Sequence, residues 1–161
     1  MADSPLSPVS PNLKEFTMSL DAEQIILVQS SFAKVKPISD QAAVLFYAKL
    51  FDIAPQVKPM FKDDMVEQGR KLMAMLNTVV NGLTNLDSIV PAAQSMAKRH
   101  VDYGVRPEHY AFVGEALLDT LAKGLGADFT PATKQAWTDA YGLLSGVMIA
   151  AAYPVAQEQR A

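Results

Sequence analysis

Two histidines carry most of the chemistry that this sequence could perform. His100 and His109 are the only histidines among 161 residues, and the chain has no cysteine. An imidazole can act as a general acid or base or as a metal ligand. Without cysteine, a disulfide framework, a thiolate metal site, a cysteine nucleophile and a covalently attached c-type haem are all excluded. Any site built on imidazole must therefore use one or both histidines.

The two histidines lie in different surroundings. His100 follows Lys98 and Arg99 near the C-terminal end of a predicted helix, where the helix dipole favours a cation. Position alone therefore favours a surface or capping role for His100 over a ligand role. His109 falls in the first turn of the next predicted helix, where a positive charge is disfavoured. We expect His109 to be an ordinary exposed residue.

The sequence carries no recognisable enzyme motif. Gly124-Leu125-Gly126 lacks the third glycine and the preceding strand of a dinucleotide-binding fingerprint. A Walker loop, a His-Glu-x-x-His motif and a Gly-x-Ser-x-Gly motif are all absent from the sequence. The adjacent carboxylates Asp63 and Asp64 are typical of a solvated loop rather than of a metal site.

Composition bounds the class of protein. A chain of 161 residues fits one domain, and half of its residues are hydrophobic, which is enough for a single core. The net charge of −3 argues against a nucleic-acid binder, which needs a basic face. Residues 1–18 are rich in proline and serine and carry no targeting signal, so we expect a flexible extension before a domain at 19–161. We expect a cytoplasmic location.

One segment is long enough to raise the question of a membrane span. Residues 140–157 are uncharged throughout, and about 20 apolar residues are needed to cross a bilayer. The segment nevertheless contains Gly142, Gly146 and Pro154 and few large aliphatic residues. These features favour a buried core helix, and we expect no membrane association.

Apolar residues spaced three and four apart predict helices in the first half of the chain. The first is capped by Ser19, carries Asp21 in its first turn and ends before Pro37. A second helix ends near Pro55, and residues 55–64 form a short irregular piece. A long helix spans about 65–83, with Gln68 on its apolar face.

Capping signals predict the helices of the second half. Asp87 or Ser88 caps a helix that runs to about residue 102, and Gly104 lies beyond it. Pro107 and Glu108 start the next helix, which ends at 124–126, and residues 130–131 cap the last one. The sequence shows no convincing strand pattern and no internal repeat. The predicted fold class is therefore all-α, with about six or seven helices.

The order and spacing of several short segments resemble a known family. Over residues 19–153 the chain resembles the bacterial single-domain globins of the flavohaemoglobin lineage. No single segment is decisive, and the specificity lies in their order. The matching segments are Leu45-Phe46-Tyr47, Leu50-Phe51, Pro55, Phe61, the stretch 68–72, the stretch 98–100, the stretch 105–110, Val113-Gly114-Glu115, Leu117-Leu118, Ala136-Trp137 and Ala140-Tyr141-Gly142.

The resemblance implies a globin fold, over residues 19–161, around a noncovalent haem b (iron protoporphyrin IX). It implies that His100 is the proximal iron ligand through Nε2, which reverses the expectation from position alone. Phe61 would stack on the porphyrin, although a plain core aromatic would occupy the same place. Tyr110 would support the proximal histidine by hydrogen bonding.

On the opposite side of the haem the resemblance implies roles for Tyr47, Gln68 and Leu72. The tyrosine hydroxyl and the glutamine amide are donors that could hydrogen-bond O₂, and Leu72 would close the pocket. Such bonds favour O₂ over the less polar CO. The alternatives are a buried Tyr47 bonded to a backbone carbonyl and a solvent-exposed Gln68.

The sequence departs from the family pattern at two points. Flavohaemoglobins carry a glutamate on the last helix that completes a network with the proximal histidine and tyrosine, whereas residues 150–152 here are three alanines. Electron push toward the iron should therefore be weaker, which puts peroxidase-like chemistry in doubt. The chain also ends at Ala161, without room for flavin and NAD(P)H domains, so we expect a separate reductase.

Three functions remain open at this point. The first is reversible binding of O₂ and other diatomic gases such as NO and CO, for storage, delivery or scavenging. The second is NO dioxygenation to nitrate with an external reductase. The third is a haem-based or haem-free sensor module. The sequence leaves open whether the protein is a monomer or a homodimer, and whether Tyr47 or Gln68 ligates the iron when no gas is bound.

Overall fold

The computed structural model describes residues 20–61, 64–102 and 104–152. These residues form six α-helices and no strand, which confirms the predicted fold class. Four short 3₁₀ turns join some of the helices, and η2 (Pro55–Met60) replaces the predicted irregular piece. The helices are α2 (Ala22–Val35), α3 (Ser39–Ile53), α4 (Met65–Asn81), α5 (Leu86–Asp102), α6 (His109–Leu125) and α7 (Pro131–Ala152).

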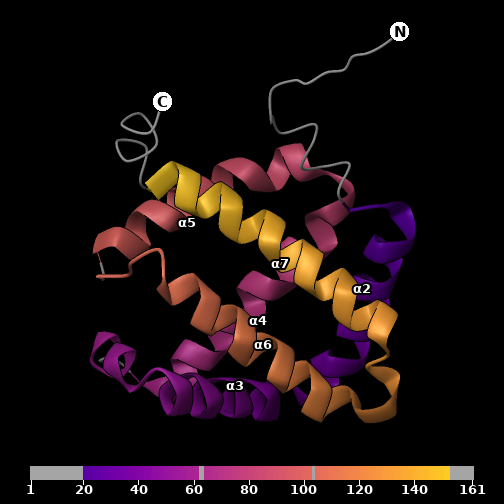
Figure 1. The fold of residues 1–161 in the computed structure, drawn as a ribbon, viewed down its shortest axis with the longest axis horizontal. Helices are drawn as coiled ribbons and strands as arrows, with labels where there is room; N and C mark the ends of the chain where they lie inside the picture. The colour runs from indigo at the N-terminus through magenta and orange to yellow at the C-terminus, as the bar shows by residue number, and fades with distance from the viewer. Residues whose placement is uncertain (1–19, 62–63, 103, 153–161) are drawn as a thin grey trace, which may run out of the picture.

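The helices pack in pairs that leave room between them. Helix α3 packs chiefly against α6, and α5 packs chiefly against α7. In Figure 1, α3 runs along one edge of the molecule, while α6 and α7 cross it diagonally and α5 lies beyond α7. Helix α4 packs on α3. Residues that are far apart in the sequence can therefore meet between α3, α4, α5 and the α6–α7 pair.

The main core lies where α2, α3, α6 and α7 meet. Val28, Phe32, Leu50 and Trp137 are buried there, each at most 3% exposed. The Trp137 indole donates to Ser31 Oγ at 2.8 Å, so its buried N–H is satisfied. Apolar burial of this extent holds the helices at fixed distances, which a precise site requires.

Several predicted helix ends are shifted in the structure. Asp21 is the N-cap of α2 rather than a first-turn residue. Its carboxylate accepts from the backbone N–H of Gln24, and the Gln24 side chain accepts from the backbone N–H of Asp21, which completes a capping box. Ser19, which we expected to be the cap, lies outside the described residues, as does the predicted extension at 1–18. Helix α4 ends two residues earlier than expected, and α5 begins at Leu86, before either predicted cap.

Helix α6 differs from its predicted bounds, and α7 is a buried helix as predicted. Helix α6 begins at His109, two residues beyond Pro107, and continues past Gly124 to a left-handed Gly126 with φ 57°. Helix α7 buries Leu143 and Met148, which confirms the prediction of a core helix. None of the described helices combines the length and apolar character needed to span a membrane.

Candidate functional site

A cavity of about 510 Å³ lies between the helices. This volume falls in the range of about 300–1,000 Å³ that is typical of sites for small molecules and cofactors. Its walls come from α3, η2 and α4 on one side, from α5 on another, and from α6 and α7 on a third. All six residues that the sequence analysis selected line this one cavity: Tyr47, Phe61, Gln68, Leu72, His100 and Tyr110.

The α5 wall presents a histidine with a fixed tautomer. His100 Nδ1 lies 2.7 Å from the carbonyl oxygen of Met96, one turn earlier on the helix. A carbonyl oxygen can only accept, so Nδ1 carries the proton and Nε2 carries the lone pair. Burial lowers the pKa of His100, with the neighbouring Arg99 adding to the effect and the Met96 bond opposing it. The ring is therefore neutral near pH 7, in the form that ligates metals.

The α3–α4 wall presents hydrogen-bond donors. Gln68 Nε2 donates to the Tyr47 hydroxyl at 3.4 Å, and Tyr47 is only 7% exposed. Burial raises the pKa of Tyr47, with the Gln68 bond opposing the shift, so the phenol stays protonated near neutral pH. The donor oxygen and the amide nitrogen thus lie next to each other in the cavity wall.

Packing fixes the position of these donors. The Tyr47 ring meets Phe46 and Phe61 edge-on, with ring centroids 4.9 and 5.3 Å apart. Helix α4 passes so close to α3 at the buried Gly69 that a Cβ there would lie 2.8 Å from Cβ of Ala43. This close approach brings Gln68, the residue before Gly69, within reach of Tyr47.

The third wall is built on a buried tyrosine pair. The Tyr141 hydroxyl of α7 donates to the backbone carbonyl of Tyr110 at 2.6 Å, which ties α7 to the start of α6. Gly114 makes room for this contact, because a Cβ there would lie 2.8 Å from the Tyr141 ring. Burial raises the pKa of Tyr141, and the nearby Tyr110 raises it further, so the hydroxyl remains a donor.

The prediction that His109 is exposed is wrong. His109 is 8% exposed and lines the cavity beside Tyr110. Its ring Nδ1 accepts from the backbone N–H of Arg106 at 3.0 Å, and the backbone N–H of His109 donates to the Arg106 carbonyl. This local turn holds the ring inside the protein. The prediction of exposure failed because it considered only how the helix dipole disfavours a charged ring. The Arg106-x-x-His109 spacing was the sequence signal that could have indicated the turn.

The mouth of the cavity is positively charged. Lys71 of α4 and Arg99 of α5 line the cavity and are exposed to solvent. No aspartate or glutamate occurs among the described lining residues, although the chain has 17 acidic residues against 14 basic ones. Neither cation was among the predicted site residues, since nothing in their spacing marks them as lining residues. The charge distribution favours an occupant that carries acidic groups.

The described residues offer no ready-made ligand set for a bare metal ion. The described residues contain no group of three or more histidine, cysteine, aspartate or glutamate side chains that could hold an ion. Of the adjacent acids, Asp64 caps α4 by accepting from the Val66 N–H, and Asp63 lies outside the described residues. One imidazole suffices only where the metal arrives with other ligands of its own, as it does in haem.

The comparison with known families decides the identity of the fold. Residues 44–148 match the globin family. The chain belongs to the globin family. Globins and flavohaemoproteins bind haem, so membership supports haem binding here. The tautomer of His100, the apolar walls and the cations at the mouth fit such a group.

The most informative relatives are flavohaemoproteins. The chain is 31% identical to the flavohaemoprotein of Rhodopirellula baltica over 117 residues, which are 71% of this chain and 29% of the relative. It is 29% identical to the flavohaemoprotein of Vibrio cholerae over 133 residues, 81% of this chain and 34% of the relative. The chain thus spans about a third of the length of these curated relatives, and the similarity supports the predicted flavohaemoglobin lineage.

Solved structures agree with this assignment. The bacterial globin of Campylobacter jejuni superimposes with a TM-score of 0.73 at 27% identity, covering 85% of this chain and 99% of that one. An engineered carbene transferase, named as a putative nitric oxide dioxygenase from Rhodothermus marinus, superimposes with a TM-score of 0.77 at 25% identity. That match covers 88% of this chain and 99% of the other.

Proposed function

We propose that this globin holds haem b in the cavity, with His100 as the iron ligand, and reversibly binds O₂ and other diatomic gases. One observation carries the proposal. Within a single cavity, α5 offers an imidazole lone pair, while α3 and α4 offer two hydrogen-bond donors. When bound, haem would supply an iron that takes a diatomic ligand. Storage, delivery and scavenging of O₂ all use this property.

The residues of the α3–α4 wall would act on the gas. The Tyr47 hydroxyl and the Gln68 amide lie 3.4 Å apart, so one small polar molecule can meet both donors. A hydrogen bond to a charged partner contributes about 1.5–3 kcal/mol, which is about ten- to hundredfold in affinity. Leu72 and Phe61 line the same cavity and keep water from competing for these donors.

The remaining walls would hold the cofactor. Burial keeps His100 neutral, and the Met96 carbonyl orients the ring and so fixes the direction of its Nε2. Lys71 and Arg99, which line the cavity at its mouth, would pair with the carboxylates of haem. Tyr110 forms part of the third wall, where it would support the histidine side of the pocket.

An absorption spectrum of the purified protein tests the proposal. We expect a Soret band after hemin is supplied, a shift on reduction with dithionite, and a further shift when CO is added. Protein that stays colourless with hemin would overturn haem binding. A ferrous spectrum that does not respond to CO or O₂ would overturn gas binding while leaving haem binding intact.

NO dioxygenation is the second candidate, favoured by the structural neighbour that is named as a putative nitric oxide dioxygenase. The reaction joins NO and O₂ and consumes one electron to give nitrate, and we propose that a separate reductase supplies that electron. Tyr47 and Gln68 would hold O₂ for either function. Continuous NO consumption with a flavin reductase and NADH indicates the enzyme, and a single turnover per haem indicates a carrier.

A further inference from the structure

We propose that His109 recognises a carboxylate of the group held in the cavity, through a hydrogen bond donated by its Nε2. The inference rests on the proposed function, because haem carries carboxylates at one edge. It assigns a role to the second histidine of the chain, which the gas-binding and iron-binding roles leave unused. His109 would position the cofactor without touching the iron.

The turn before α6 fixes which nitrogen of His109 carries the proton. The backbone nitrogen of Arg106 lies 3.0 Å from the ring Nδ1 of His109, and the backbone nitrogen of His109 lies 3.0 Å from the carbonyl oxygen of Arg106. A backbone N–H can only donate, so Nδ1 must present its lone pair. The proton of the neutral ring is therefore on Nε2, which makes Nε2 a donor and prevents it from ligating a metal.

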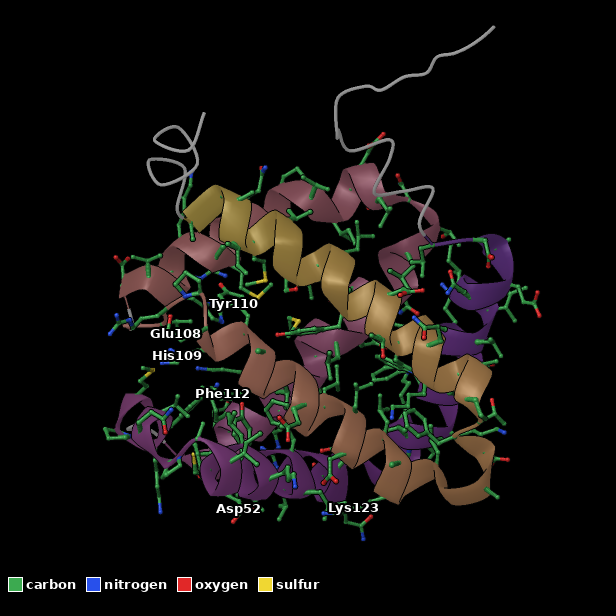
Figure 2. All side chains as sticks on the ribbon, in the orientation of Figure 1. Asp52, Glu108, His109, Tyr110, Phe112 and Lys123 are labelled. Carbon is green, nitrogen blue, oxygen red and sulfur yellow. The ribbon has the colours of Figure 1, made fainter. Side chains whose placement is uncertain are left out.

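The histidine is held in place by packing against its neighbours. His109 is 8% exposed, and its ring lies beside Phe112 with centroids 6.4 Å apart. In Figure 2, His109 and Phe112 lie on the α3 side of α6, whereas Tyr110 lies toward α5 and α7. Nε2 makes no hydrogen bond to any residue in 20–61, 64–102 or 104–152. Because His109 lines the cavity, a donor of its ring that is not used within the protein is available to an acceptor of the group held there.

The composition of the cavity wall indicates the chemistry of that acceptor. The described lining residues include Lys71 and Arg99 but no carboxylate, so a salt bridge within the wall cannot satisfy the donors. The nitrogen atoms of haem are occupied by iron, and the rest of its periphery is apolar apart from the carboxylates. A carboxylate is therefore the acceptor that haem can offer to His109 Nε2, and such charge-assisted bonds are strong.

Two substitutions separate the nitrogens of the ring. In His109→Asn the amide oxygen can replace Nδ1 and keep the Arg106 bond, while the Nε2 donor is lost. In His109→Gln the longer amide can replace the Nε2 donor, while the Arg106 bond is lost. Each variant and the wild type are loaded with haem and, separately, with haem dimethyl ester, whose carboxylates are blocked. Transfer of the cofactor to excess apomyoglobin then gives its dissociation rate.

We expect His109→Asn to speed dissociation of haem by about tenfold, the effect of one charge-assisted bond, and to change dissociation of the dimethyl ester by less than twofold. His109→Gln should retain most of the wild-type difference between the two cofactors. Equal acceleration of both cofactors by His109→Asn would overturn the proposal, because it would show a packing or water-mediated role.

The experiment also separates this inference from the proposed function. If the wild type takes up neither cofactor, haem binding itself fails. If the wild type binds haem and His109→Asn leaves its dissociation rate unchanged, only the role of His109 fails. Circular dichroism of the apo variants checks folding, and an Asn variant with a wild-type melting curve assigns any change in retention to the lost donor.

Discussion

Two regions of the cavity wall offer opposite kinds of chemical group. The α5 wall offers a lone pair, because a backbone carbonyl takes the only proton of the neutral His100 ring. The α3–α4 wall offers protons, because burial keeps the Tyr47 phenol neutral and the Gln68 amide lies beside it. A metal needs the first kind of group, and a polar diatomic molecule needs the second.

The difference lies in how each side chain is oriented. The imidazole of His100 is held by a backbone atom one helical turn away, so its geometry follows from the helix alone. The Tyr47–Gln68 contact joins side chains from two helices, so it depends on how closely α3 and α4 pack. The α5 wall should therefore be robust to distant changes, while the α3–α4 wall should be sensitive to the helix crossing.

Removing the imidazole of His100 should have the largest effect, because it deletes the group that distinguishes the α5 wall from the α3–α4 wall. His100→Ala deletes the proposed iron ligand, and we expect loss of haem during purification or a large fall in Soret absorbance per protein. Imidazole added to the buffer should restore part of the spectrum. His109→Ala is the comparison variant, because it removes a ring that presents a proton rather than a lone pair: we expect it to release haem faster than the wild type but to keep the wild-type spectrum while haem is bound. Full haem retention with an unchanged spectrum in His100→Ala would remove His100 from the ligand role.

A larger residue at the helix crossing should disturb only the α3–α4 wall. Gly69→Ala places a Cβ 2.8 Å from Cβ of Ala43, so the helices must separate. Overpacking of this kind costs about 1–3 kcal/mol in the free energy of unfolding, measurable by urea denaturation of the apoprotein. Gly142→Ala, at an exposed helical position where a Cβ meets nothing within 4 Å, should instead stabilise by about 0.5–1 kcal/mol. Equal effects of both substitutions would contradict the crossing geometry.

These two regions also show what the sequence could and could not predict. Periodic apolar residues and breakers such as Pro55 were sufficient for six helices, because each signal is local. Helix ends were less predictable, since Asp21 rather than Ser19 makes the capping box of α2. The capping signals in the sequence were compatible with several adjacent residues, and packing selects among them.

The candidate site also contains both residues that the sequence could predict and residues that it could not. The resemblance selected six residues that line one cavity, although composition and spacing alone favoured a capping role for His100. His109 was wrongly expected to be exposed, because its position depends on a turn with Arg106 that no periodic pattern reveals. Lys71 and Arg99 were missed because a charged residue at the mouth of a cavity has the same pattern as any solvated one.

Deleting the phenol hydroxyl should weaken gas binding without affecting haem retention. In Tyr47→Phe the ring packing against Phe46 and Phe61 is kept, and one donor is lost. We expect O₂ to dissociate about tenfold faster or more, as measured by stopped-flow with a CO chase. Tyr141→Phe is the control, because that hydroxyl donates to the Tyr110 carbonyl, and we expect less than a threefold change. An unchanged rate in Tyr47→Phe would show that Gln68 alone holds the gas.

The smallest effect should come from Gln68, whose amide is shared with Tyr47. Gln68→Leu removes one neutral donor, and we expect O₂ to dissociate about two- to tenfold faster, less than for Tyr47→Phe. Because Gln68 Nε2 donates to the Tyr47 hydroxyl, it also orients that hydroxyl, so the two losses should not add. In the double variant we expect an off-rate below the product of the single effects. Strict additivity would mean that the 3.4 Å contact does not couple the donors and that each acts on the gas independently.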